Sequence, residues 1–276
     1  MEVRRHIAQD LLHFPTQILI TTSLIVILTG VGFVAGVVDA IAGGGGLLVL
    51  PALLLSGIDP VSALATNKLQ GSFGTGSATL AYARHGHIDF NRSKLMIATT
   101  FVAACLGVLA VAYAPTSLLA AIMPILLIVM AVYFALSPKL SDIDVHARTT
   151  LTKYSCTAAP AIGFYDGIFG PGAGSFYFLG FVALLGYGVL RASAHTKLLN
   201  FTSNIASLLV FALSGKILWP LGLAMGAGQF LGAQVGSRLA IRNGASLIRP
   251  LLVIVCCGMA IKLLLDPANP LRVLFP

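Results

Sequence analysis

Two aspartates stand beside clusters of glycine inside long apolar runs. Asp39 begins the stretch DAIAGGGG (39–46), and Asp166 begins DGIFGPGAG (166–174). A buried carboxylate can take up a proton or face a cation, so this placement predicts a role in coupling an ion or a substrate. The competing interpretation is structural, with each carboxylate accepting backbone N–H groups where a helix is broken. A purely topological role is the third, and the residue types leave all three open.

A lysine follows each glycine cluster, Lys68 in ATNKL (65–69) and Lys197 in AHTKL (194–198). A lysine at the start of an apolar segment can extend its ammonium group to the membrane interface, which would make both residues anchors. Alternatively, both face the glycine clusters and bind an anion. The hydroxyls and amides that follow favour the second interpretation, because they suit a hydrated path. The polar residues expected to bind a substrate with the two lysines are Thr66, Asn67, Gln70, His195, Thr196, Asn200 and Asn204.

The glycine clusters themselves predict broken helices. Each glycine costs about 1 kcal/mol in a helix interior, so four in a row should end the helix. The helix that begins after such a break presents free N–H groups and the positive end of its dipole, which together bind anions. The simpler alternative is close packing of helices through small residues. No Gly-Lys-Ser/Thr sequence follows either cluster, so a nucleotide-binding loop is excluded. The glycines expected at the site are Gly44, Gly45, Gly46, Gly172 and Gly174.

The charged residues belong to an internal duplication that covers nearly the whole chain. Asp39 and Asp166 are 166 − 39 = 127 residues apart, and Lys68 and Lys197 are 197 − 68 = 129 residues apart. Further matches at the second offset are Gly86 with Gly215, Phe101 with Phe230, and Gly107 with Gly236. An insertion of two residues near Gly174 would account for the change of offset. The duplicated positions include charges in apolar surroundings, which favours a functional role for them.

The composition predicts an integral membrane protein. Hydrophobic residues make up 57% of the 276 positions, charged residues make up 9%, and the mean hydropathy is +0.94. A soluble domain is about 25% charged. The spans should be helices, because lipid offers no partner to unpaired backbone groups. The net charge of +8 lies in short loops, as expected of residues that set orientation, and no basic stripe predicts nucleic-acid binding.

Other chemistry has little support. His85, His87 and Asp89 share a loop but are too few for a metal site. No Ser-His-Asp or HExxH pattern lies on one segment, so neither an enzyme nor a cofactor is expected. The cysteines lack CxxC spacing and are expected to be small buried hydrophobic residues. They are Cys105, Cys156, Cys256 and Cys257.

The predicted organisation is all-α, with a polar tail (1–16), a first transmembrane repeat (17–137), a cytoplasmic linker (138–153), a second repeat (154–266) and a C-terminal tail (267–276). The apolar run from Ile18 exceeds the about 7–15 residues of a signal-peptide core and is expected to remain. The segment at 46–57 is too short to span, so it is half of a hairpin or half of a broken span. The apolar segments fall at 17–38, 46–57, 66–83, 95–114, 117–137, 154–170, 174–190, 197–214, 217–238 and 247–265.

Eight to ten crossings follow, four or five in each repeat. The loops at 84–94, 138–153 and 238–249 each carry three Lys or Arg, and five segments per repeat place all three on one side, taken as cytoplasmic. An odd number of segments also inverts the second repeat relative to the first. Inverted repeats of this kind occur in secondary transporters, whose sites lie at the midplane where broken helices meet.

At these residues the sequence resembles the TauE/SafE family of membrane transporters, and most closely its YfcA-like branch. The resemblance covers about residues 28–266 and rests on GFVAGVVDAIAGGGGLLVLPALL, ATNKLQGSFG, GFYDGIFGPGAGSF, AHTKLLNFTSNIASL and LGAQVGSRLA. It implies an inverted-repeat exporter or carrier of small anions, with sulfite, sulfonates such as sulfoacetate and related organosulfur compounds as the substrate theme.

The resulting hypothesis is a secondary carrier in the bacterial inner membrane, with export the favoured direction. It would move a small sulfur oxyanion or sulfonate by alternating access around a midplane site. A passive anion channel, and a membrane sensor or assembly subunit that transports nothing, are the alternatives. The expected partners are the anionic solute and the lipid bilayer. The residues leave open whether a proton or a sodium ion is coupled, and whether the chain forms a homodimer.

Overall fold

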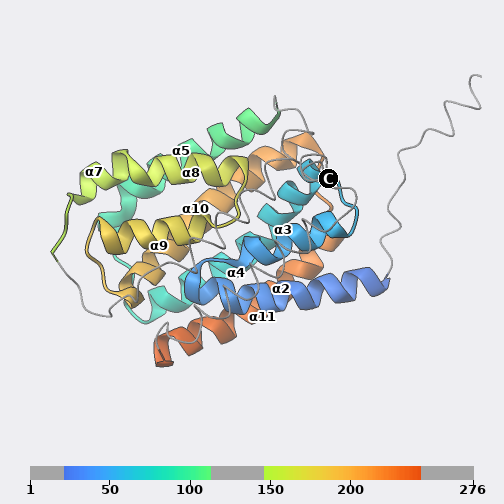
Figure 1. Ribbon diagram of the computed structural model, residues 1–276, viewed down its shortest axis with the longest axis horizontal. Helices are drawn as coiled ribbons and strands as arrows, with labels where there is room; N and C mark the ends of the chain where they lie inside the picture. Colours follow the sequence, from blue (N-terminus) through green and yellow to red (C-terminus); the bar gives the residue numbers. More distant parts are fainter. Residues whose placement is uncertain (1–21, 113–145, 244–276) are drawn as a thin grey trace, which may run out of the picture.

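A computed structural model describes residues 22–112 and 146–243, and the regular structure in these ranges is helical (Figure 1). The helices within residues 22–112 are α2 (Thr22–Ala42), α3 (Gly45–Leu55), α4 (Pro60–Arg84) and α5 (Phe90–Ala112). Those after residue 145 are α7 (Leu151–Cys156), α8 (Ala158–Ile168), α9 (Ala173–Ala183), α10 (Val189–Ser214) and α11 (Trp219–Asn243). Several predicted parts of the chain lie outside the described residues: the segments 117–137 and 247–265, both tails and most of the linker. The predicted total of eight to ten crossings therefore cannot be counted within the described residues.

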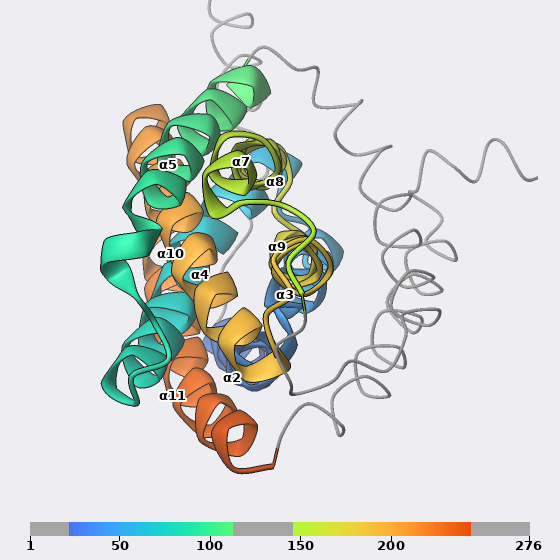
Figure 2. The same cartoon turned by 90° about the vertical axis from the view of Figure 1, so that its left-hand side faces the viewer.

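The described helices form two layers, which Figure 2 shows nearly end-on. One layer contains the long helices in the order α5, α10, α4 and α11, each in contact with the next. The other layer contains α8, α9, α3 and α2. The most extensive contacts between the layers join α2 to α11 and α8 to α5. The two parts of the chain are therefore interleaved rather than placed side by side.

Three described helices are long and apolar enough to cross a membrane: Thr22–Ile41, Phe90–Val111 and Val189–Ser214. Helices α4 and α11 each have 25 residues, which is about 37 Å at 1.5 Å per residue, but they are more polar. Much of the polarity of α4 is turned inward, since Asn67, Lys68 and Gln70 are buried. The all-helical, multi-span prediction is thus confirmed for the described residues.

The glycine clusters reverse the direction of the chain. α2 ends at Ala42, Gly43 has φ +83°, and α3 begins at Gly45 and returns along α2 (Figure 1). Gly170 and Gly172, with φ +88° and +78°, separate α8 from α9 in the same way. Only glycine adopts such angles readily. The predicted helix breaks are present, and of the two forms considered the hairpin is the one observed.

Two predicted segments differ from the observed helices. The segment at 154–170 is split into α7 and α8, because Pro160 has no N–H to donate to the carbonyl of Cys156 and its ring crowds that carbonyl. The predicted segment at 174–190 is helical only as far as Ala183, where α9 ends after 11 residues. Apolar residues continue beyond it, but Gly186 has φ +68° and Gly188 caps the next helix. Apolar composition alone overestimated the length of this helix.

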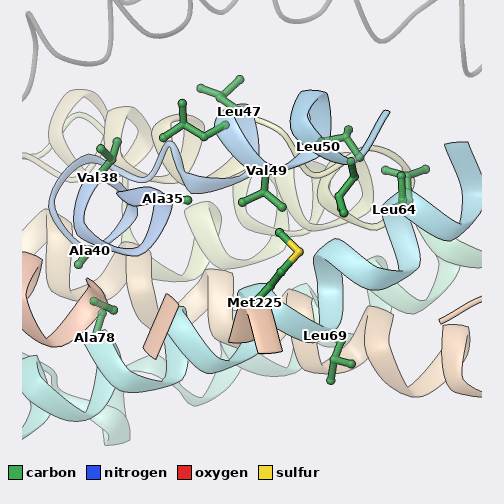
Figure 3. Close-up of a cluster of buried hydrophobic side chains, with 14 of the residues drawn as sticks. Ala35, Val38, Ala40, Leu47, Val49, Leu50, Leu64, Leu69, Ala78 and Met225 are labelled. Carbon is green, nitrogen blue, oxygen red and sulfur yellow. The ribbon is translucent and has the colours of Figure 1, made fainter. Parts of the chain in front are cut away.

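The largest hydrophobic core packs α3 between α2 and α4, with α11 against them. Figure 3 shows it around Val49 and Leu50 of α3, Leu64 and Leu69 of α4, and Met225 of α11. These side chains are fully or almost fully buried. The start of α4 is fixed by Asp59, whose carboxylate accepts from the Ser62 N–H at 3.0 Å. The core thus holds the first hairpin against the long helices.

The described parts of the three basic loops, 84–94, 146–153 and 238–243, lie at one end of the molecule, the left in Figure 1. The backbone N–H of Arg148 donates to the carbonyl of Leu184 at this end. The start of α2 and the α10–α11 connection lie at the other end. α4 runs toward the basic end and α10 runs away from it.

The cysteine prediction is wrong for Cys156, which is exposed, and Cys105 is only partly buried. Cys156 is the last residue of α7, where the helix breaks and its outer side has no protein neighbour among the described residues to cover it. In a membrane protein lipid can cover such a surface, so an apolar run does not ensure burial within the protein. Cys256 and Cys257 lie outside the described residues.

Candidate functional site

The two glycine turns touch each other inside the molecule. A Cβ atom added to Gly43 would lie 2.7 Å from the carbonyl carbon of Gly174, and one added to Gly174 would lie 2.6 Å from the Gly43 oxygen. Real Cβ atoms do not come this close to other atoms, so the contact requires glycine at both positions. The helix break and the close packing through small residues, which were considered as alternatives, therefore both occur at these turns.

Each lysine forms an ion pair with the aspartate of the other half of the chain. Lys68 Nζ lies 2.6 Å from Asp166 Oδ1 and also donates to the Asp166 carbonyl. Lys197 Nζ lies 3.4 Å from Asp39 Oδ2. Both lysine side chains are 1% exposed, so neither extends to a surface as an interfacial anchor would. The pairs join α4 to α8 and α10 to α2.

The carboxylate of Asp39 also stabilises a helix start. Its Oδ1 atom accepts from the backbone N–H of Gly45, the first residue of α3, at 3.1 Å. An internal carboxylate therefore occupies the position where a bound anion was expected at this helix N-terminus. Asp166 is held by Lys68 and by the hydroxyl of Ser203, which donates to Oδ2. Bracing and ion pairing occur together at Asp39.

A small polar cavity, the central cavity, lies between the turns and the long helices. Its volume of about 30 Å³ holds on the order of two water molecules. Nine residues of the predicted site line it: Asp39, Gly46, Asn67, Gln70, Asp166, Gly172, Gly174, Asn200 and Asn204. Asn67 Oδ1 accepts from Gln70 Nε2 at 2.8 Å, and Asn204 Nδ2 lies 3.4 Å from Thr75 Oγ1. A sulfonate needs more space than this, so the described conformation does not accommodate one.

The central cavity is rich in unpaired acceptors. Asp39 Oδ2, Gln70 Oε1, Asn200 Oδ1 and Gln229 Oε1 are buried, and among the described residues they have no hydrogen-bond partner. Leaving such a group unpaired costs about 1–3 kcal/mol. Four such acceptors around one cavity give it a lining that suits water or another hydrogen-bond donor.

Other predicted site residues do not line the central cavity. Thr66 Oγ1 accepts from the N–H of Leu218 at 3.1 Å and so fixes the start of α11. Thr196 is buried, and its hydroxyl has no partner in the described part of the chain. Gly44 and Gly45 form the turn into α3. Lys68 and Lys197 approach the aspartates that line the cavity without lining it themselves.

His195 points elsewhere. It lines a second cavity of about 580 Å³ at the basic end, together with His87, Asp89 and Arg191. Its Nδ1 atom lies 2.9 Å from the Arg191 carbonyl, and its ring packs against Tyr187 at 5.3 Å. Because His195 and Lys197 are two positions apart on a helix, they lie on nearly opposite faces of α10. One helix thus faces two cavities.

The predicted site did not include five residues that line the central cavity: Gly43, Gly71, Thr75, Gly170 and Gln229. Gly71 lets Asn204 approach α4, because a Cβ added to Gly71 would lie only 3.2 Å from Asn204 Nδ2. Gln229 carries an amide in the middle of α11. Its position in the duplication could have identified it as a site residue, because Gln229 corresponds to Thr100 at the offset that relates Lys197 to Lys68. Helices that span a membrane carry few such amides without function.

These features define a class of protein: a multi-pass membrane protein with ion pairs and a polar cavity buried between broken helices, the arrangement of a membrane transporter. The sulfite exporter TauE/SafE family model matches residues 28–263. The chain belongs to this family, which is one of transporters and not of enzymes.

Individual relatives agree with the family match. The chain is 54% identical over 241 residues to the probable membrane transporter protein ORF9 of Sinorhizobium sp, which covers 87% of this chain and 92% of the relative. It is 47% identical over 253 residues to the probable membrane transporter protein YfcA of Escherichia coli, covering 92% and 94%. A probable membrane transporter protein of Haemophilus influenzae is 42% identical over 243 residues, covering 88% and 95%. No solved structure matches the chain.

Proposed function

We propose that this protein is a secondary carrier that moves a small sulfur oxyanion or sulfonate across the bacterial inner membrane, with export as its main direction. The observation that carries the proposal is the pair of buried Lys–Asp contacts across the central cavity. Removing charges from water is costly, so four of them at bilayer depth are expected to serve the solute. The family description, sulfite exporter, supports the choice of solute.

Two inverted repeats, 17–137 and 154–266, joined by a cytoplasmic linker at 138–153, would provide the alternating movement. The opposite directions of α4 and α10 support this organisation, as do the ion pairs that link each half to the other. The basic end would face the cytoplasm. The small volume of the central cavity supports a carrier over an open channel, because a channel needs a continuous path wide enough for the anion.

The anion would bind where Lys197 offers its ammonium group. The three N–H bonds of Lys197 Nζ have no hydrogen-bond acceptor among the described residues, although Asp39 lies 3.4 Å away. Asn67, Asn200 and Asn204 bring amide groups to the same cavity. Opening of the helix layers would enlarge the cavity and let the oxyanion replace Asp39 beside Lys197.

The test combines binding and flux on purified protein. A ligand that binds the folded state raises the melting temperature, so sulfite, methanesulfonate and sulfoacetate are compared with acetate and chloride. The same anions are then offered to proteoliposomes. Lys197→Ala should lose both the stabilisation and the uptake, whereas Lys216→Ala, at an exposed position between α10 and α11, should keep both. Wild-type protein that neither binds nor carries any of these sulfur anions would overturn the proposal.

A further inference from the structure

The two ion pairs are equally buried but unequally bonded. The Lys68–Asp166 pair is short, at 2.6 Å, and its carboxylate accepts a second bond from Ser203. The Lys197–Asp39 pair is 3.4 Å long, and neither Lys197 Nζ nor Asp39 Oδ2 has a hydrogen-bond partner among the described residues. The carboxylate side chains are 4% and 7% exposed, so contact with solvent does not explain the difference.

The difference follows from one position on each of two helices. The residue 129 positions before Ser203 is Gly74, which has no hydroxyl to donate. A Cβ at Gly74 would lie 2.4 Å from Cγ of Gln229, so the amide of Gln229 fills the corresponding space. The residue 129 positions before Gln229 is Thr100, a smaller side chain. The duplication therefore retained the charges but changed their neighbours.

Gln229 and Asp39 lie on two helices that are in close contact. The backbone carbonyl oxygen of Gln229 would be 2.3 Å from a Cβ on Gly36, one turn before Asp39 on α2. Both Gln229 and Asp39 line the central cavity, each with an oxygen that has no partner in the described ranges. Asp39, Gln229 and Lys197 thus each keep a polar group without a hydrogen bond from the described residues, whereas both carboxylate oxygens of Asp166 are hydrogen-bonded.

The charges of the site limit what can bind there. The charges of the two lysines and the two aspartates sum to zero, so a bound monovalent anion leaves one uncompensated negative charge in a buried cavity. Such a charge is costly unless a positive charge accompanies it. A proton on Asp39 Oδ2, the oxygen that lies 3.4 Å from Lys197 Nζ, restores neutrality, and it also releases Lys197 to the anion.

We infer that Asp39 is the proton-binding residue of the transport cycle and that one proton moves together with each monovalent anion, while the Lys68–Asp166 pair stays closed. This inference rests on the proposed function. The proton binds Asp39 Oδ2 from water on the side where the anion enters, and it leaves to water on the side where the anion leaves. The cycle carries no net charge, so the anion and proton gradients set its direction, and an excess of anion inside drives export.

Few titratable side chains of the described helices face Asp39 and could compete with it for the proton. α3 presents no titratable side chain, and α11 presents the uncharged Gln229 while Arg238 is exposed. Tyr82 donates its hydroxyl to the Ala40 carbonyl at 3.0 Å and is engaged there. The other charged groups that face Asp39 from the described helices are Lys197 on α10 and, across the cavity, Lys68 and Asp166.

The experiment measures protons and anions together in proteoliposomes. Methanesulfonate is the probe, because it stays ionised near neutral pH and carries no proton of its own. Labelled methanesulfonate reports the anion and an enclosed pH dye reports the proton. Wild-type protein is expected to move one proton per anion, at a rate that does not change when the membrane potential is clamped by potassium and valinomycin.

Asp39→Asn and Asp166→Asn form a matched pair. Asp39→Asn imitates the protonated state, so it should still exchange internal for external methanesulfonate while the proton-to-anion ratio falls from one to zero. Asp166→Asn, if it still transports, should keep a ratio of one. A wild-type ratio of zero, or an unchanged ratio in Asp39→Asn, would overturn the inference while anion flux still supported the proposed function. Wild-type protein without flux of any sulfur anion would overturn both.

Discussion

Lys68 and Lys197 stand at corresponding positions of the duplication but differ in their hydrogen bonds. Lys68 donates to both the side chain and the backbone carbonyl of Asp166, which ties α4 to the end of α8. Lys197 lies beside Asp39, but its ammonium group has no hydrogen-bond acceptor among the described residues. The first lysine is therefore held in place by hydrogen bonds, and the second keeps its N–H groups unbonded within the described ranges, as the proposed role in binding a solute requires.

The first prediction concerns the tight pair. Lys68→Ala leaves the Asp166 carboxylate buried without its cation, which should cost about 3–5 kcal/mol of stability. The double variant Lys68→Ala/Asp166→Ala removes both charges and should recover much of that loss. Melting temperatures of the wild type, both single variants and the double variant in detergent give the interaction energy. A double variant no more stable than Lys68→Ala would show that the ion pair is not what stabilises this contact.

The second prediction concerns Ser203. Ser203→Ala deprives Asp166 of a hydroxyl donor and should lower stability by about 1–3 kcal/mol, because a buried charged acceptor loses a partner. Ser207→Ala is the matched control, since it lies one turn along α10, is buried, and its hydroxyl has no partner among the described residues. Equal effects of the two substitutions on the melting temperature would contradict the assigned role.

At the scale of the helices, the sequence was most informative about where they end. The glycine breaks followed from a strong backbone preference, and the polar residues after each lysine favoured a position facing the glycine clusters over an interfacial one. The pairing of Lys68 with Asp166 did not follow, because a repeat shows which residues correspond and not which ones touch. The break between α7 and α8 depends on Pro160, whose effect in a membrane helix varies with its neighbours.

The third prediction concerns the contact between the turns. Gly43 and Gly57 have nearly the same backbone angle, φ +83° and +82°, but only Gly43 contacts another turn; nothing in the described structure lies within 4 Å of a Cβ on Gly57. Gly57→Ala should therefore show only the backbone cost, about 1–2 kcal/mol. Gly43→Ala should destabilise the protein further and abolish uptake. Similar melting temperatures and uptake for both variants would mean that the turns do not need to touch.

At the scale of the whole molecule, the interleaving of the two parts of the chain determines the geometry of the site. α2 packs on α11 and α8 packs on α5, so each hairpin is supported by a long helix from the other part. The sequence predicted that the three basic loops share one side, and their described parts do lie at one end. The two-layer packing and the central cavity could not be predicted, because they depend on contacts between distant segments.

The fourth prediction is topological. In a variant without native cysteines, single cysteines at Asn91 and Thr149, at the basic end, should react with a membrane-impermeant maleimide only from the cytoplasmic side. A cysteine at Lys216, between α10 and α11, should react only from the outside. Comparing the labelling of each cysteine in intact cells with its labelling in inverted vesicles shows which side of the membrane that cysteine faces. Asn91 and Lys216 labelling from the same side would contradict the proposed orientation.

The exchange of partners between the two parts of the chain also matters during synthesis. When the first part enters the membrane, Asp39 and Lys68 are already present, but Lys197 and Asp166 have not yet been made. Each unpaired charge at bilayer depth costs about 2.5–3.5 kcal/mol, so we expect the nascent chain to be poorly inserted until its C-terminal part arrives. Truncated chains should therefore be recognised and degraded by membrane quality control, and the two parts produced as separate polypeptides in one cell should protect each other.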